Sequence, residues 1–239
     1  MYSDAAAAEL YNLLNAWGAS DDFYLALVMD SSSVLDVGCG TGTMLHRARS
    51  AGHRGRLVGV DPDRSALAIA RRRDDITWME GTAASMVWER EFELAVMMSH
   101  AFQSLVTDDE LRTSLAVIRN ALVDGGRFVF ETRNPAVREW ETWNPDHPIE
   151  VVDAAGRALR ITYQVQSIVG DVVTLTETTS DVDGTVLRVD QASLRFLDVE
   201  RLTRFLTETG FSIDAQQGDW SGGSLNQESR EIVTFARRA

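Results

Sequence analysis

The chain has 239 residues, 44% of them hydrophobic, which is enough for one sizeable α/β domain with a decoration but not for two full domains. Its 36 acidic and 23 basic residues leave a net charge of −13, and such a surface repels phosphate backbones, so no nucleic-acid partner is expected. One cysteine excludes a disulfide within the chain. No membrane-helix span and no secretion signal is recognised, so a cytoplasmic protein without a membrane partner is expected.

Two helices are predicted at the start of the chain. Residues 4–16 repeat leucines on one face of a helix, and Asp4 can cap its first turn. Asp21 or Asp22 caps a second helix that runs to about Met29.

The stretch from residue 34 to residue 43, Val-Leu-Asp-Val-Gly-Cys-Gly-Thr-Gly-Thr, is an apolar run that ends in glycines and precedes a helical pattern. This order predicts a strand, a tight turn and a helix. Glycine is needed where a backbone turns sharply or where a ligand must lie against it, and the free N–H groups at the helix start favour polar ligand atoms. The next predicted strand ends at Asp61, where an acid can accept hydrogen bonds from ribose hydroxyls.

Residues 34–61 together resemble the first motif and the acidic loop of class I S-adenosylmethionine (SAM) methyltransferases. The resemblance implies that Asp36 lies near the methionine part of SAM, that the glycine turn passes beneath it, and that Asp61 holds the ribose. It also implies that helices in residues 1–30 lie over the cofactor cleft. A turn that binds NAD, or nothing, is the alternative, although the third glycine comes one residue too early for a dinucleotide fingerprint. The residues implied in cofactor binding are Tyr11, Asp36, Gly38, Cys39, Gly40, Gly42, Asp61, Pro62, Thr82, Ala83 and Ser99.

The adenine contact departs from the family pattern. Methyltransferases often carry an aspartate at the position of Thr82, after the third predicted strand, to hold the adenine amino group. The Thr82 hydroxyl or the backbone N–H of Ala83 is expected to take that role.

His100 is the candidate catalytic residue. A fourth apolar strand, residues 92–98, runs into Ser99-His100-Ala101-Phe102-Gln103, and ligands of open α/β sheets bind beyond the carboxyl ends of strands. This segment resembles that of bacterial small-molecule methyltransferases, including sugar-amine and glycine-type N-methyltransferases. His100 could accept a proton from the nucleophile or hydrogen-bond the substrate, and the alternative is a structural histidine.

A capped helix over residues 108–122 and a fifth strand over residues 127–132 continue the resemblance. The Asn-Pro-Pro-aromatic motif of nucleobase-amine methyltransferases does not follow the fourth strand, which argues against DNA as the substrate. The Asp-Asn metal pair of catechol-type enzymes is also missing, so no metal is predicted.

The pattern changes to period-two alternation over residues 151–196, which predicts a small antiparallel sheet inserted after the fifth strand. A parity slip predicts a bulge or break near residues 190–193. By analogy the sheet is expected to be a substrate lid, with a homodimer surface or a plain decoration as alternatives. Trp140 and Trp143 just before it could line a pocket or pin the linker. A helix from Asp198 and two more strands complete the chain.

The predicted fold is therefore one α/β domain over residues 1–239, with a seven-stranded Rossmann-like sheet flanked by helices and the β insertion. The predicted function is a SAM-dependent methyltransferase that acts on a nitrogen or oxygen of a small polar metabolite, with nitrogen slightly favoured. A catalytically silent SAM-binding protein and an NAD-dependent oxidoreductase are the alternatives.

Overall fold

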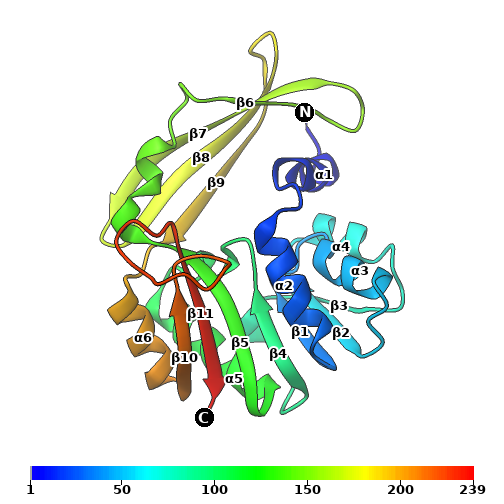
Figure 1. Cartoon of the computed structure of the whole chain (residues 1–239). Helices are drawn as coiled ribbons and strands as arrows, with labels where there is room; N and C mark the ends of the chain where they lie inside the picture. The colour runs from blue at the N-terminus through cyan, green and yellow to red at the C-terminus, as the bar shows by residue number, and fades with distance from the viewer. Residues whose placement is uncertain (1) are drawn as a thin grey trace.

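The structure, a computed structural model, describes residues 2–239 and contains two sheets (Figure 1). The main sheet consists of β1 Ser33–Val37, β2 Arg56–Asp61, β3 Thr77–Glu80, β4 Phe92–Met97, β5 Leu122–Arg133, β10 Phe211–Gln217 and β11 Glu231–Arg238. Its strand order is β10-β11-β5-β4-β1-β2-β3. Strands β1 to β5 run parallel, and β11 pairs antiparallel with both β5 and β10.

Helices cover both faces of this sheet. They are α2 Ala19–Met29, α3 Thr43–Ser50, α4 Arg64–Ala70, α5 Asp108–Ala121 and α6 Val199–Glu208. A further helix, α1 Asp4–Leu14, packs against α4 and the inserted sheet. One face packs against α5 and α6, with Leu35 and Phe128 among its buried residues, and the other packs against α2 and α3, with Val34 and Val129. Because both faces are buried, the central strands are apolar almost throughout rather than alternating.

The ends of the first two helices differ from the prediction. Ser3, not Asp4, caps α1 by accepting a hydrogen bond from the Ala6 N–H at 3.2 Å. Helix α2 begins earlier, at Ala19, and the Asp21 carboxylate reaches back to the Gly18 N–H at 2.8 Å. An acid at the third helical position can satisfy the cap backbone in this way, so Asp21 supports the cap without being it.

The inserted sheet consists of β6 Ile149–Val152, β7 Ala158–Val169, β8 Val172–Asp181 and β9 Val186–Arg195, all antiparallel. The predicted break near residues 190–193 is wrong, because β9 pairs with β8 without a shift from Arg188 to Arg195. The change in the alternation of apolar residues along β9 therefore does not mark a bulge. Val189 is apolar but lies on the solvent face, where it is 57% exposed, whereas Leu194 lies opposite the buried Val173. The predicted fold, a seven-stranded Rossmann-like sheet with an antiparallel insertion after the fifth strand, is confirmed.

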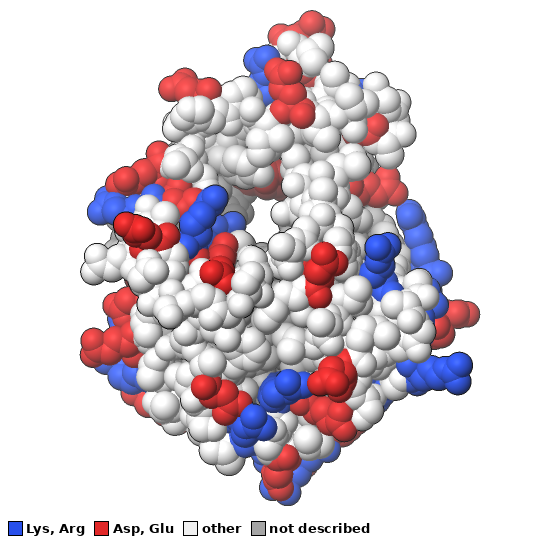
Figure 2. All heavy atoms as spheres, viewed as in Figure 1, with Lys and Arg blue, Asp and Glu red and all other residues white. Residues whose placement is uncertain are grey.

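The inserted sheet arches over the carboxyl ends of β4 and β5, and α1 lies beneath it (Figure 1). Leu10 of α1 is buried with Leu159 and Ile161 of β7. Figure 2 shows the molecular surface hollowed between the inserted sheet and the main body. No helix in residues 2–239 is both long and apolar enough to cross a membrane.

Candidate functional site

The glycine turn after β1 has a backbone that only glycine adopts freely. Gly40 and Gly42 have φ of +53° and +75°, in the left-handed region. A Cβ on Gly42 would lie 2.4 Å from the Trp78 ring, so packing also excludes a side chain there. A Cβ on Gly40 would meet no atom within 4 Å, so the backbone at Gly40 borders open space that a ligand can approach.

Asp36 is a buried carboxyl group without a partner. It is fully buried in β1, and neither carboxylate oxygen has a hydrogen-bond partner among residues 2–239. Burial raises its pKa to about 8, and the charge of Asp61 adds to the rise. A buried acceptor left unpaired is costly, so the site fits a ligand that brings a donor or a positive charge, as the amino acid part of SAM does.

Asp61 is tied to the glycine turn. Its Oδ2 accepts the Gly40 N–H at 2.7 Å, and its Oδ1 accepts the Asp63 N–H at 2.8 Å. Burial raises the pKa of Asp61, and these two backbone hydrogen bonds oppose the rise. The structure thus brings the acid predicted for the ribose to the turn, beside the exposed Pro62.

Cys39 contributes packing rather than reactivity. Its side chain is buried, and burial raises the pKa of the thiol. Its N–H donates to the Val60 carbonyl at 3.0 Å. A thiol held in the neutral form is a poor nucleophile.

The segment after β3 presents the residues predicted for the adenine contact. Ala83 is buried at the start of a short 3₁₀ helix, Ala83–Ser85, and Thr82 is the exposed residue before it. The Thr82 side chain makes no capping hydrogen bond to this turn, so its hydroxyl is available to another partner.

His100 is held by carboxylates on two neighbouring strands. Its N–H donates to Oε1 of Glu131 at 2.8 Å, and its Nε2 lies 2.9 Å from Oε2 of Glu231. The other oxygen of Glu131 accepts the Tyr24 hydroxyl of α2. Burial raises the pKa of Glu131, whereas the charge of His100 and the hydrogen bond from Tyr24 oppose the rise.

The sequence pattern did not single out Tyr24, Glu131 and Glu231. A signal for Glu131 was present, because an acid that directly follows the apolar run Phe128-Val129-Phe130 of a central strand must find partners inside the protein. Glu231 gave no such signal, since it begins a strand whose neighbour the sequence does not specify.

Tyr11 reaches the same region from α1. Burial raises the pKa of its hydroxyl, and hydrogen bonding to Ser99 opposes the rise. The charges of Glu131, Arg133 and Asp61 also act on this hydroxyl. The structure therefore brings Tyr11 close to Ser99 and within the influence of the Asp61 charge, although the tyrosine as a whole remains 45% exposed.

The inserted sheet adds a tyrosine that sequence analysis did not single out. Tyr163 of β7 lies opposite Glu177 of β8, and burial and this carboxylate raise the pKa of its hydroxyl. The charge of Arg133 acts on Tyr163 as it does on Tyr11. The Arg133 guanidinium lies 5.3 Å from the ring centre of Trp143, one of the two tryptophans before the inserted sheet.

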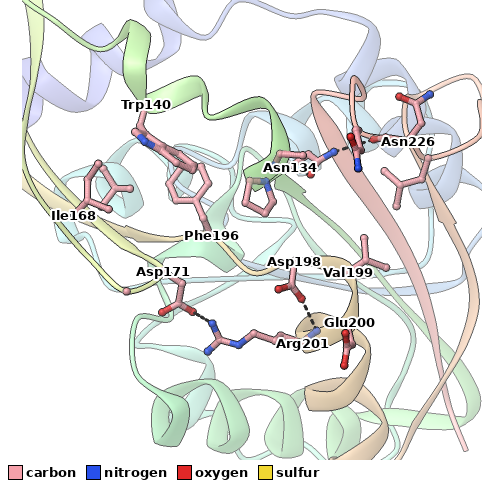
Figure 3. A pocket seen from close by; sticks show the side chains of 16 residues that line it. Asn134, Trp140, Ile168, Asp171, Phe196, Asp198, Val199, Glu200, Arg201 and Asn226 are labelled. Atoms are coloured by element: carbon pink, nitrogen blue, oxygen red, sulfur yellow. Dashed lines mark hydrogen bonds and ion pairs between the residues drawn. The ribbon is translucent and has the colours of Figure 1, made fainter.

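A separate cavity of about 1110 Å³ lies between the β7–β8 turn, the start of α6 and the loop before β11 (Figure 3). On one side of it, Trp140 and Phe196 pack edge to face with their ring centres 4.5 Å apart. On another side, Nη1 of Arg201 lies 2.8 Å from Oδ2 of Asp171. None of the residues predicted for cofactor binding or catalysis lines it. The buried unpaired carboxyl group of Asp36 and the imidazole of His100 thus lie at the carboxyl edge of the main sheet, and neither residue lines this cavity.

Known proteins resemble this chain in sequence and structure. The sequence model of a family described as "Methyltransferase domain" matches residues 34–126. The cypemycin N-terminal methyltransferase of Streptomyces sp is 24% identical over 98% of this chain and 97% of its own length. The dTDP-3-amino-3,4,6-trideoxy-α-D-glucopyranose N,N-dimethyltransferase of Streptomyces venezuelae is 28% identical over 87% of both chains. The SAM-bound amino pentose methyltransferase CalS10 from Micromonospora echinaspora superposes with a TM-score of 0.70 at 20% identity, over 96% of this chain and 97% of that one.

Proposed function

The chain belongs to the SAM-dependent methyltransferases, with SAM as its cofactor, and from this premise we propose that it methylates an amine nitrogen of a small polar metabolite. The names of two relatives support nitrogen as the acceptor atom, since one is an N-terminal methyltransferase and the other an amino-sugar N,N-dimethyltransferase. The observation that carries the proposal is His100, whose imidazole is anchored to Glu231 beside the site that holds Asp36 and Asp61.

In this proposal each of the cofactor residues binds a different part of SAM. Asp36 supplies an unpaired acceptor for the ammonium group of the cofactor, because its two oxygens have no partner in the protein. Asp61 accepts from the ribose hydroxyls, and its bonds to the turn hold it at the edge of the open space above Gly40. The Thr82 hydroxyl and the Ala83 N–H are proposed for the adenine.

Bound SAM supplies a methyl group on a sulfonium, ready for displacement by a nucleophile. An acceptor amine must lose a proton as its nitrogen–carbon bond forms, and His100 is proposed to take that proton and pass it to solvent. Tyr11, Ser99 and Tyr163 line the approach and can orient the acceptor by hydrogen bonds. Orientation alone contributes about 7 kcal/mol or more to such reactions in favourable cases.

The inserted sheet is proposed to act as the lid of this site. Its inner face carries Tyr163 and Glu177 toward the residues at the end of β5, and α1 closes the adjacent side. A closed lid excludes water from the reacting groups and commits the bound substrate to reaction.

Calorimetric titration with SAM, S-adenosylhomocysteine and NAD tests the cofactor site. Wild-type protein is expected to bind the first two with micromolar affinity, and Asp61→Ala is expected to lose that binding. Asp74→Ala, which removes an exposed carboxylate after α4, serves as the matched control. Unchanged SAM affinity in Asp61→Ala would contradict the role given to Asp61.

A panel of amines and their hydroxyl counterparts tests the acceptor. Glucosamine against glucose, and a dipeptide with a free N-terminus against its hydroxy-acid analogue, differ chiefly in the acceptor atom. Formation of S-adenosylhomocysteine is expected with the amines. Turnover on the hydroxyl partners alone would reassign the enzyme to O-methylation.

A further inference from the structure

The turn that carries His100 has an unusual backbone. Ser99 and His100 have φ of +53° and +61°, so two consecutive residues with side chains adopt the left-handed conformation. Residues with a Cβ avoid this region, and a pair of them persists only where surrounding contacts determine it. The turn therefore needs a specific restraint.

Glu131 supplies that restraint. The carboxylate is 2% exposed, and it accepts the His100 N–H with one oxygen and the Tyr24 hydroxyl with the other. Tyr24 is itself 1% exposed on α2, so the carboxylate cannot shift without breaking a second buried contact. The backbone of His100 is thus fixed to the middle of the main sheet.

Glu231 acts on the ring. It lies directly opposite Arg133 in the β5–β11 pairing, and its Oε2 is 2.9 Å from Nε2 of His100. Carboxylate oxygens only accept, so Nε2 must carry the hydrogen in the neutral ring. Nδ1 then keeps its lone pair, and no residue in 2–239 donates a hydrogen bond to it.

We propose that Glu131 and Glu231 are the positioning residues of His100, Glu131 by fixing its backbone turn and Glu231 by fixing the ring with Nδ1 as the basic atom. This inference rests on the proposed function only for the role of Nδ1 as the catalytic base. The arrangement of the two glutamates around His100 is a property of the free protein. Glu131 and Glu231 come from adjacent regions of the sheet that approach His100 independently, one at its backbone and one at its ring.

Nitrogen NMR of the histidine rings tests the role of Glu231 without any acceptor. Protein labelled with ¹⁵N-histidine is measured near pH 9, where imidazoles are neutral. His100 is expected to show at least about a tenfold excess of the Nε2–H form. Glu231→Ala should lower that excess by at least about half, toward the ratio of a short unstructured histidine peptide, and Glu231→Asp should recover part of it.

Two histidines of the same spectrum are internal controls. Nε2 of His53 lies 2.7 Å from the Ser31 carbonyl, and Nε2 of His46 lies 2.8 Å from the Ala70 carbonyl, so both rings should keep the Nε2–H form in every variant. If His100 keeps its wild-type ratio in Glu231→Ala, or shows the Nδ1–H form in the wild type, the proposal is overturned.

Amide hydrogen exchange tests the role of Glu131. Glu131→Gln has nearly the same shape but cannot present two carboxylate oxygens as acceptors, and it should speed exchange of the His100 amide at least about tenfold. The amide of Leu35 in β1 should not change. Equal His100 exchange in wild type and Glu131→Gln would remove Glu131 from the proposal. Neither measurement depends on turnover, so a failure here is separate from a failure of the acceptor panel.

Discussion

Two carboxylates in the central strands, Asp36 and Glu131, are buried with very different partners. Glu131 accepts two hydrogen bonds from the protein, whereas Asp36 accepts none among residues 2–239. A buried acid whose hydrogen bonds are all made within the protein holds the local structure in place. A buried acid without such bonds can accept one from a bound ligand. The two acids therefore predict different responses to substitution.

Asp36→Asn should stabilise the free protein at alkaline pH and weaken SAM binding. Burial raises the pKa of Asp36 to about 8, so the folded protein keeps its proton up to that pH. The unfolded chain loses that proton near pH 4, so the contribution of Asp36 to stability declines as pH rises from about 4 to about 8. Asparagine removes the decline and should raise the free energy of unfolding at pH 8 by about 1–3 kcal/mol, with little effect at pH 4.

Urea unfolding at pH 4 and pH 8 measures this difference, and calorimetry measures the loss of SAM affinity. Asp74→Asn is the control for removal of an exposed acid. The same dependence of stability on pH in wild type and Asp36→Asn would mean that Asp36 is not the group responsible.

His100→Ala should lower turnover far more than SAM affinity. General base catalysis contributes about 10²–10⁴-fold, so kcat should fall by that factor with the amine acceptors of the panel. SAM binding should change little, because Asp36 and Asp61 rather than His100 are proposed to hold the cofactor. Steady-state kinetics together with calorimetry measures both quantities, and unchanged turnover would make His100 structural.

Helix α1 connects the two sheets of the molecule. Leu10 packs into the inserted sheet with Leu159 and Ile161, while the Thr41 hydroxyl of the glycine turn donates to Oδ1 of Asn12 at 2.7 Å. The helix thus contacts the proposed lid and the proposed cofactor turn at once. Loss of the packing of α1 should therefore disturb both the inserted sheet and the glycine turn.

Leu10→Ala should release α1 without unfolding the main sheet. A buried leucine shortened to alanine costs about 2–5 kcal/mol, which is enough to undock a helix of 11 residues. Hydrogen exchange over residues 4–14 should rise, and SAM affinity should fall about tenfold or more. Leu13→Ala is the matched control on the same helix, because Leu13 is 46% exposed and its loss should cost less than about 0.5 kcal/mol. Equal SAM affinity in the two variants would contradict a coupling through α1.

The whole molecule carries a net charge of −13, and acidic side chains are scattered over the face that Figure 2 shows. Such a field attracts cations and repels anions as they approach the hollow between the two sheets. Amines are protonated at neutral pH before they reach His100. The net charge is therefore suited to the proposed acceptor class.

Salt should lower kcat/KM for cationic amine acceptors. Raising ionic strength from about 0.01 M to about 1 M shortens the screening length from about 30 Å to about 3 Å, so steering of a cation should weaken severalfold. A neutral acceptor of similar size should show a flat response. A rate that rises with salt would instead indicate an anionic acceptor, such as one that carries a phosphate.

The sequence by itself determined the main sheet and most of the cofactor edge. The order of apolar strands, glycine turn and acids at strand ends depends on local chain geometry and on burial, and both leave periodic and positional traces in the sequence. Asp36, Asp61 and the turn between them could be identified because they lie on adjacent strands joined by one helix.

Only the tertiary structure decided what surrounds His100. Tyr24, Glu131 and Glu231 are separated from it by 76, 31 and 131 residues, and no local pattern specifies contacts over such separations. The same holds for the inserted sheet, whose alternating residues predict strands but not which face meets α1 and the end of β5. Local sequence encodes the conformation of each element, whereas the partners of a buried polar side chain depend on how all the elements pack together.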